Sequence, residues 1–374
     1  MKIDWKHLDK SYFLLIFLPA FVVSMYMHAA PLVQFILACA AIIPLAKLLG
    51  HATESIAEQT TENLGGLLNA TFGNATELLI AFFALKAGHL SLVKASLTGS
   101  LLANVLLLAG LAMFLGGRKF GPQQFSMRIV GRQMVLCAVA VSAMLIPALF
   151  ASSSFEMEDP QAMAEGGEIV MQSVKMSTAD VEKMSIFIAI VMILTYFTAV
   201  FHSFKHVPKQ EAKEVEGHHW SMWPSIALLA GSTLVIAWVS EGLVHSVEGV
   251  IATTNMSELF IGIVIIPIIG NAAEHITAVT VALKNKMDLS FSIAIGSSTQ
   301  IALFVAPLLV LMSLFTKYHM DLVFTVPEIA SVGMATLILS IIVSDGKTNW
   351  FEGVSLLAVY LILAGAFYFV PVGH

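Results

Sequence analysis

The sequence predicts an all-α integral membrane protein in which one extra N-terminal helix precedes two five-helix inverted repeats. Three observations predict this fold: the composition, a series of long apolar runs, and a motif that recurs at one fixed offset. Hydrophobic residues make up 57% of the 374 residues and charged residues only 12%, whereas soluble domains carry about 25% charged residues. Such a chain cannot cover a water-exposed surface, which excludes a cytosolic enzyme. The net charge of −6 provides no basic surface for nucleic acid.

Each membrane-spanning helix needs about 20 mostly apolar residues. Runs of this kind predict about eleven helices, at residues 11–28, 31–57, 65–87, 91–115, 131–151, 184–204, 222–247, 258–283, 289–315, 325–344 and 352–371. The first run follows three lysines, as a signal peptide would. No small-residue cleavage site follows it, so we expect a retained helix over residues 1–28.

The placement of lysine and arginine predicts the orientation. With a cytoplasmic N-terminus, the cytoplasmic side holds Lys2, Lys6, Lys10, Arg118, Lys119, Arg128, Arg132, Lys205, Lys209, Lys213, Lys284, Lys286 and Lys347. The outer side holds only Lys86, Lys94, Lys175, Lys183 and Lys317, and Lys47 lies within a helix. This bias follows the positive-inside rule. We therefore expect a multi-pass protein of the inner (plasma) membrane with its N-terminus in the cytoplasm.

Two loops are long. Residues 152–183 are strongly acidic and face the outer side in this topology. They are interpreted either as a solvated loop or as an acidic collar that concentrates cations. Residues 205–221 mix lysine and glutamate and form the expected cytoplasmic linker between the two halves of the chain.

The repeat is visible in two short motifs, Gly73-Asn74-Ala-Thr-Glu77 and Gly270-Asn271-Ala-Ala-Glu274. The same shift of 197 residues aligns Gly65 with Gly262, Ala81 with Ala278, Leu92 with Leu289, Gly99 with Gly296 and Ser100 with Ser297. Identities at one offset indicate a duplication. Because each unit contains five helices, the two units enter the membrane from opposite sides. This predicts inverted repeats at residues 31–204 and 222–374, an architecture common among secondary transporters.

Glu77 and Glu274 are the central candidate residues. A carboxylate near the bilayer centre costs about 2.5–3.5 kcal/mol on insertion scales, so a matched pair needs a function. Asn74 and Asn271 lie three residues before them and share their helix faces. Gly73 and Gly270 permit helix breaks that free backbone carbonyls as ligands. Carboxylate, amide, hydroxyl and carbonyl oxygens suit a hard divalent cation, calcium above all.

The following helices supply more oxygens. Ser100 and Asn104 are one turn apart on the fourth helix, and Ser297 and Gln300 are one turn apart on the ninth. We expect them to hold the glutamates or coordinate the ion; the alternative is that they only hydrogen-bond to neighbouring helices. Asn104 and Gln300 are one position out of register under the 197-residue shift, so the repeat alone does not pair them.

Proton binding is expected at the same two glutamates. Removing a carboxyl from water favours its protonated form, so protons compete with a metal ion for Glu77 and Glu274. Glu54 and Glu241 begin the two repeats and are interpreted either as gate or proton-path residues or as polar helix ends. Glu258, Asp288, Asp345 and Glu352 are expected to be solvated at helix ends, and Glu328 is explained by the dipole of its helix.

At these motifs the chain resembles the calcium/cation–proton exchanger (CAX) family of the cation/calcium exchanger superfamily. Segments 65–77, 96–104, 270–275, 284–288 and 296–301 carry the resemblance, which extends from about residue 31 to the C-terminus. It implies that Glu77 and Glu274 bind cation and proton and that helices two and seven form the moving gate. The second repeat has no acid beside its glutamate, unlike the sodium/calcium exchanger branch, which favours a proton as counter-ion. In lacking a long N-terminal soluble region, the sequence resembles bacterial or archaeal members of the family.

We therefore expect a secondary active antiporter that exchanges calcium for protons by alternating access, with its ion site at mid-membrane between the repeats. The alternatives are another divalent cation, sodium as counter-ion, or a passive cation channel. An enzyme is not expected, since there is no His-Glu-x-x-His pair and no Walker A sequence. No cofactor is expected. The expected partners are the divalent cation and the lipid bilayer, with no nucleic acid, and assembly into a homo-oligomer is left open.

Overall fold

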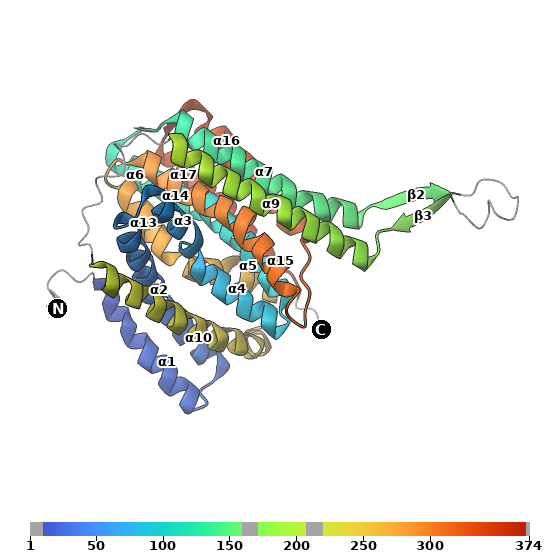
Figure 1. Ribbon diagram of the computed structural model, residues 1–374, viewed down its shortest axis with the longest axis horizontal. Helices are drawn as coiled ribbons and strands as arrows, with labels where there is room; N and C mark the ends of the chain where they lie inside the picture. The colour runs from blue at the N-terminus through green and yellow to red at the C-terminus, as the bar shows by residue number, and fades with distance from the viewer. Residues whose placement is uncertain (1–9, 159–170, 207–219, 372–374) are drawn as a thin grey trace, which may run out of the picture.

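The computed structural model describes residues 10–158, 171–206 and 220–371, and these form a nearly all-helical molecule (Figure 1). The first half contains a 3-10 turn Lys10–Ile16, α1 Phe17–Tyr26, α2 Pro31–Glu58, α3 Glu62–Phe72, α4 Ala75–Ala87, α5 Leu90–Leu102, a π-helical segment Ala103–Leu108, α6 Ala109–Phe120, α7 Met127–Ser152 and α9 Thr178–His206. The second half contains α10 Met222–Thr254, α11 Glu258–Phe260, a π-helical segment Ile261–Ile265, α12 Ile266–Gly270, α13 Ala272–Ala282, α14 Met287–Gln300, a π-helical segment Ile301–Val305, α15 Ala306–Ser313, α16 Val326–Ile342, a 3-10 turn Val343–Asp345 and α17 Trp350–Tyr368.

Two short antiparallel ribbons interrupt the helices, and the sequence analysis predicted neither. Strand β1 Gln123–Gln124 pairs with β4 Lys347–Thr348, and β2 Ser154–Glu158 pairs with β3 Met171–Lys175. The second ribbon projects from one end of the bundle (Figure 1) and forms the stem of the acidic 152–183 loop. Residues 159–170 of that loop and 207–219 of the linker lie outside the described residues, so the collar interpretation stays a prediction.

Eight described helices are long and apolar enough to cross a membrane, or nine if the bent pair Glu258–Gly270 and Ala272–Ala282 counts as one span. The two other predicted spans correspond to a shorter apolar helix, Tyr12–Tyr26, and to α3 and α4, which divide the predicted helix 65–87. The count of eleven membrane crossings stays a prediction.

Helix ends follow the local sequence. The Thr325 and Asn349 side chains each form a capping box with a glutamate three residues later, Glu328 and Glu352, at the starts of α16 and α17. Both caps satisfy backbone N–H groups that a helix start leaves without partners. The C-terminal end of α4 is also set by its sequence. This helix stops at Gly88, whose φ of 90° lies in the left-handed region, which glycine adopts without strain.

The centre of the molecule consists of the two helices that follow the repeated motifs. In the most apolar stretches of the spans Leu90–Phe120 and Met287–Ser313, 78% of the residues are buried inside the protein. The corresponding fraction is 22% for the spans Thr178–His202 and Trp350–Tyr368. The central pair runs antiparallel. The start of the first helix lies beside the end of the second, because Lys94 near the start of α5 contacts Asp321 in the loop after α15. The start of the second helix lies beside the end of the first, because Asp288 at the start of α14 accepts a hydrogen bond from the backbone of Ser126, which follows α6. An antiparallel central pair is what two inverted repeats would produce, and the repeat bounds 31–204 and 222–374 stay a prediction.

Helices α2 and α10 make the most extensive helix–helix contact, and α1 packs outside them (Figure 1). Phe21 of α1 is fully buried, packs edge-on against Trp238 and lies over Gly242 of α10. A Cβ at position 242 would approach the Phe21 ring to 2.6 Å. The N-terminal helix is therefore fastened to the α2–α10 pair.

Candidate functional site

Both repeated motifs lie at breaks in helices. Helix α3 ends at Phe72 and α4 begins at Ala75, so Gly73 and Asn74 lie between them. Asn271 likewise separates α12 from α13, with a bend of 59°. Glu77 and Glu274 thus lie in the first turns of α4 and α13. The free N–H groups and dipole of a helix start stabilise negative charge, which lowers the cost of a carboxylate inside the membrane.

The two glutamates lie at the interface of the repeats. Glu77 is 8% exposed and Glu274 is half-buried, and the carboxyls are close enough to interact electrostatically. Glu77 also lies against the other motif, because a Cβ at Gly270 would be 3.4 Å from its Cγ and Oε1 atoms. The Glu77 side chain therefore packs directly beside the helix break of the second repeat.

Asn74 is held entirely by the second repeat. Its Nδ2 donates to Oε1 of Gln300 at 2.5 Å, and its Oδ1 accepts a hydrogen bond of 3.0 Å from the Ser297 hydroxyl. Ser297 also interacts with the Glu274 carboxyl. Both groups that hold Asn74 come from α14, so the motif of the first repeat is positioned by a helix of the second.

Asn271 is held in the corresponding way by the first repeat. Its Nδ2 donates to the Ser100 hydroxyl at 3.2 Å and to the Pro267 carbonyl at 3.0 Å, and its Oδ1 accepts from Asn104 Nδ2 at 3.4 Å. Asn104 Nδ2 also lies 3.1 Å from Ser297 Oγ. The amides and hydroxyls therefore form one connected network across four helices, in which each bond supports the orientation of the next.

Asn104 and Gln300 occupy corresponding places, each beside a motif asparagine of the opposite repeat. Asn104 lies within the π-helical segment Ala103–Leu108, and Gln300 directly precedes the segment Ile301–Val305. Such local widenings of a helix are frequent at functional sites. The serines and amides bond to neighbouring helices, as one of the two expectations required. Coordination of an ion by these side chains, the other expectation, stays a prediction.

Three buried oxygens in this region accept no hydrogen bond from the described residues: Glu77 Oε2, Glu274 Oε2 and Asn104 Oδ1. Buried acceptors without a donor are costly, and a cation or, for the carboxyls, protons would satisfy them. Within the described part of the chain no three His, Cys, Asp or Glu side chains form a metal-binding group. A divalent cation here would rest on two carboxylates with neutral oxygens, which is the donor set of a calcium site.

Glu54 and Glu241 lie on the long helices α2 and α10. Glu54 is exposed on α2. Glu241, on α10, lies 4.0 Å from Lys86 at the end of α4, the helix that carries Glu77. A role for either residue in gating or in a proton path stays a prediction.

Two other acidic residues, Glu328 and Glu258, are more buried than their positions at helix ends predict. Glu328 is 1% exposed, closes the capping box and accepts a weak 3.4 Å hydrogen bond from Thr98 of α5. Glu258 is only 29% exposed and contacts His89. The spacing Thr325-x-x-Glu328 was a visible capping signal. The contacts with Thr98 and His89 had no sequence signal, because they join residues about 170 or more positions apart.

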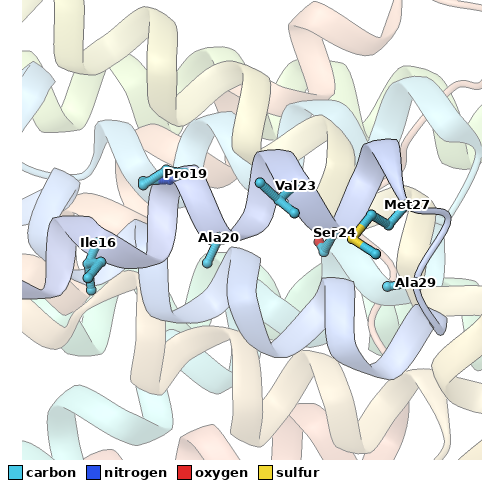
Figure 2. Close-up of a pocket in the computed structure, with 7 residues that line it drawn as sticks. All are labelled: Ile16, Pro19, Ala20, Val23, Ser24, Met27 and Ala29. Atoms are coloured by element: carbon cyan, nitrogen blue, oxygen red, sulfur yellow. The ribbon is translucent and has the colours of Figure 1, made fainter.

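A shallow open depression of about 570 Å³ lies elsewhere, along the apolar face of α1 between Ile16 and Ala29 (Figure 2). Its lining contains no residue of either motif. An apolar groove on a peripheral helix is the surface that a lipid-facing segment presents, so it does not mark the ion site.

Comparisons with known proteins agree with this architecture. The family described as sodium/calcium exchanger protein matches residues 30–205 and 224–369. A relative from Bacillus subtilis, the Ca(2+)/H(+) antiporter ChaA, is 41% identical over 371 residues, covering 96% of this chain and 99% of its own. A Ca(2+)/H(+) antiporter from Aphanothece halophytica is 40% identical and covers 96% of both chains.

Solved structures show the same fold. Native YfkE is 40% identical, with a TM-score of 0.81 over 96% of this chain and 100% of its own. An H+/Ca2+ exchanger CAX shares the fold at 15% identity, with a TM-score of 0.70 over 96% of this chain and 91% of its own. The predicted fold class, a helical multi-pass membrane protein of the exchanger type, is confirmed. The resemblance to cation exchangers is confirmed as well, and this chain belongs to the sodium/calcium exchanger protein family.

Proposed function

We propose that this protein is a secondary active antiporter that exchanges calcium for protons by alternating access. The observation that supports this most directly is the pair Glu77 and Glu274. They are carboxyls from opposed repeats, and each has a buried oxygen that accepts no hydrogen bond from the described residues. Such a pair can hold one dication or protons, and the two loads exclude each other. Relatives about 40% identical over nearly their whole length are named for this exchange, which supports the proposal.

The proposed ligands are the Glu77 and Glu274 carboxylates with the Asn104 side-chain oxygen. Ser100, Ser297, Asn74, Asn271 and Gln300 support them through the network and offer further oxygens. Gly73 and Gly270 are proposed to act through the backbone at the helix breaks. Calcium accepts six to eight oxygens in flexible geometry, so the remaining positions suit water or backbone carbonyls.

Alternating access needs one part of the molecule to move against another. The pair α2 and α10, with α1 attached, is the proposed moving part, and the buried central helices are the proposed fixed part. In this proposal residues 31–204 and 222–374 are the two repeats, the N-terminus lies in the cytoplasm and the protein resides in the plasma membrane. The proton gradient then drives calcium out of the cell, and no cofactor takes part.

Calcium-45 uptake into proteoliposomes with an acidic interior tests this proposal, with a pH dye read in parallel. The wild type should accumulate calcium and dissipate the internal acid together. Glu77→Gln and Glu274→Gln should abolish both while still inserting. Glu182→Gln, the same change at an exposed acid that contacts His319, is the matched control and should transport normally.

Two results would overturn the proposal. Calcium uptake that needs no pH gradient would favour sodium exchange or a channel, and a sodium gradient would separate these two. Full activity in both glutamine variants would show that the carboxyl pair is not the ion site. Competition by manganese or strontium then defines which divalent cation the site prefers.

A further inference from the structure

A second carboxylate-rich contact lies away from the ion site, at the turn between α4 and α5. His89 begins α5, and its Nδ1 lies 2.7 Å from Oε1 of Glu258 in α11. Its Nε2 lies 3.8 Å from Oε1 of Glu248 in α10. The His89 side chain is 14% exposed, whereas Glu248 is 79% exposed. One imidazole thus faces carboxylates from two different helices.

This arrangement suits the doubly protonated ring. A neutral imidazole has one N–H donor, whereas the imidazolium has a donor on each nitrogen and a positive charge. Only the charged form can attract both glutamates. The hydrogen bond to Glu258 raises the pKa of His89 most strongly. Burial opposes this rise, and the charges of Glu258 and then Glu248 add smaller raising effects.

The surrounding groups do not compete for this role. Lys86, at the end of α4, is directed toward Glu241 of α10 at 4.0 Å. From the α15–α16 loop the Tyr318 ring packs against Gly88, where a Cβ would approach it to 2.9 Å. Lys317 of the same loop lies over the Tyr318 ring, 5.2 Å from its centroid. Among the described residues, the carboxylates that face the His89 ring within 4 Å are Glu258 of α11 and Glu248 of α10.

The contact crosses the boundary between the proposed moving and fixed parts. Glu248 belongs to α10, the partner of α2, whereas His89 and Glu258 begin the elements that lead into the buried centre. It lies at the same end of the bundle as the β2–β3 ribbon. This follows because the Tyr318 loop that covers Gly88 also carries His319, which contacts Glu182 near the start of α9. In the predicted topology this end faces the outside.

We propose that His89 is a proton-operated latch that fastens the outer end of α10 to the α4–α5 turn and α11. Protonation of its imidazole from the outer side draws Glu248 and Glu258 together and stabilises the conformation seen here. The latch rests on the proposed function in one respect, that α10 is a moving helix. Because the pKa of His89 is raised in the folded protein, the latch is closed at acidic pH and released as pH rises through that value.

Spin-label distances in the full-length protein in nanodiscs test the latch. Cysteines replace exposed Ser91 on α5 and exposed Ala252 on α10, and alanine replaces the buried free cysteines Cys39 and Cys137. Between about pH 5 and 8, the range in which histidine titrates, the distance distribution should change from narrow to broad and longer. Calcium and a gradient are both omitted.

Three substitutions make the result specific. His89→Gln should show the broad distribution at every pH. His89→Lys, charged throughout, should keep the narrow one. Glu248→Gln removes the carboxylate by which α10 meets His89, and it should likewise show the broad distribution at every pH. His319→Gln is the matched control, because it removes another histidine–glutamate contact at the same end without touching α10; it should respond as the wild type does.

A wild type without a pH response, or a His89→Gln variant with the wild-type response, would overturn the latch. If His89→Gln does not fold, the test rests on His89→Lys. A broad distance distribution for His89→Lys at high pH would overturn the latch as well. These distances do not depend on transport. Failure of the latch therefore leaves the calcium-uptake result standing, and inactive transport with a normal distance response overturns only the proposed function.

Discussion

The Ser297 hydroxyl donates a 3.0 Å hydrogen bond to Oδ1 of Asn74, although 223 residues separate the two. The bond joins a helix of the second repeat to the motif of the first. Asn271 is linked to the first half with the donor and acceptor exchanged, because its Nδ2 donates a 3.2 Å hydrogen bond to the Ser100 hydroxyl. Each half therefore supplies groups that orient the motif asparagine of the other.

The first prediction concerns Ser297. Ser297→Ala removes the hydrogen bond to Asn74 and the acceptor of Asn104 Nδ2, leaving buried polar groups without partners, which costs about 1–3 kcal/mol. Calcium affinity should fall correspondingly, by about 5- to 150-fold, as measured by calorimetry in detergent. Ser298→Ala is the control, since among the described residues the Ser298 hydroxyl bonds to the Ala294 carbonyl of its own helix. Equal effects in the two variants would contradict a special role of Ser297.

The second prediction concerns Gly270. In Gly270→Ala the new Cβ would lie in van der Waals contact with Glu77, 3.4 Å from its Cγ and Oε1 atoms. The added methyl group would occupy the space beside the carboxyl, where an ion would have to approach it. We expect reduced calcium transport with a nearly unchanged melting temperature. Gly333→Ala has open space around it and should transport normally.

The third prediction concerns the crossing of α5 with the π-helical segment Ile261–Ile265. A Cβ at Gly99 would lie 2.3–2.6 Å from the backbone of Ile263, so Gly99→Ala must push the two apart. Overpacking of this kind costs about 1–3 kcal/mol. Thermal unfolding followed by size-exclusion chromatography should show a lowered midpoint. Gly131→Ala, which meets no atom within 4 Å, should melt as the wild type does, and an unaffected Gly99→Ala would refute the tight crossing.

The fourth prediction concerns pH and stability. Because contact with Glu258 raises the pKa of His89, this pair stabilises the folded protein below the ordinary histidine value and ceases to do so as pH rises through the raised value. His89→Gln should therefore lower the melting temperature at pH 5.5 more than at pH 8.5. A difference that is constant with pH would exclude the ion pair as its cause.

The fifth prediction concerns the start of α16. Thr325→Ala removes the side chain that caps this helix and bonds to buried Glu328. Loss of a cap costs about 0.5–2 kcal/mol, so the midpoint of thermal unfolding should fall. Calcium transport per folded molecule should change little. Thr253→Ala removes a hydroxyl that bonds only to carbonyls of its own helix, and it should not alter the midpoint.

Much of the fold and part of the site followed from sequence patterns. The apolar runs placed the helices, and the shift of 197 residues identified the two motifs. The same reasoning missed both β-ribbons, the burial of Glu328 and the His89 contacts. Long-range pairs leave no periodic signal in the chain, and two-residue strands such as β1 are too short to show the alternation that marks a strand.

What the sequence determined by itself is the chemistry and the symmetry. The composition requires a lipid environment. The two Gly-Asn-x-x-Glu motifs, repeated at one offset, place two carboxyls inside apolar helices, where such costly groups indicate a function. What only the tertiary structure decided is which groups meet. Asn104 pairs with Asn271, and Gln300 with Asn74, although they are one position out of register in the repeat. Contacts between two repeats depend on how helices cross in space, and the offset along one chain carries no information about that crossing.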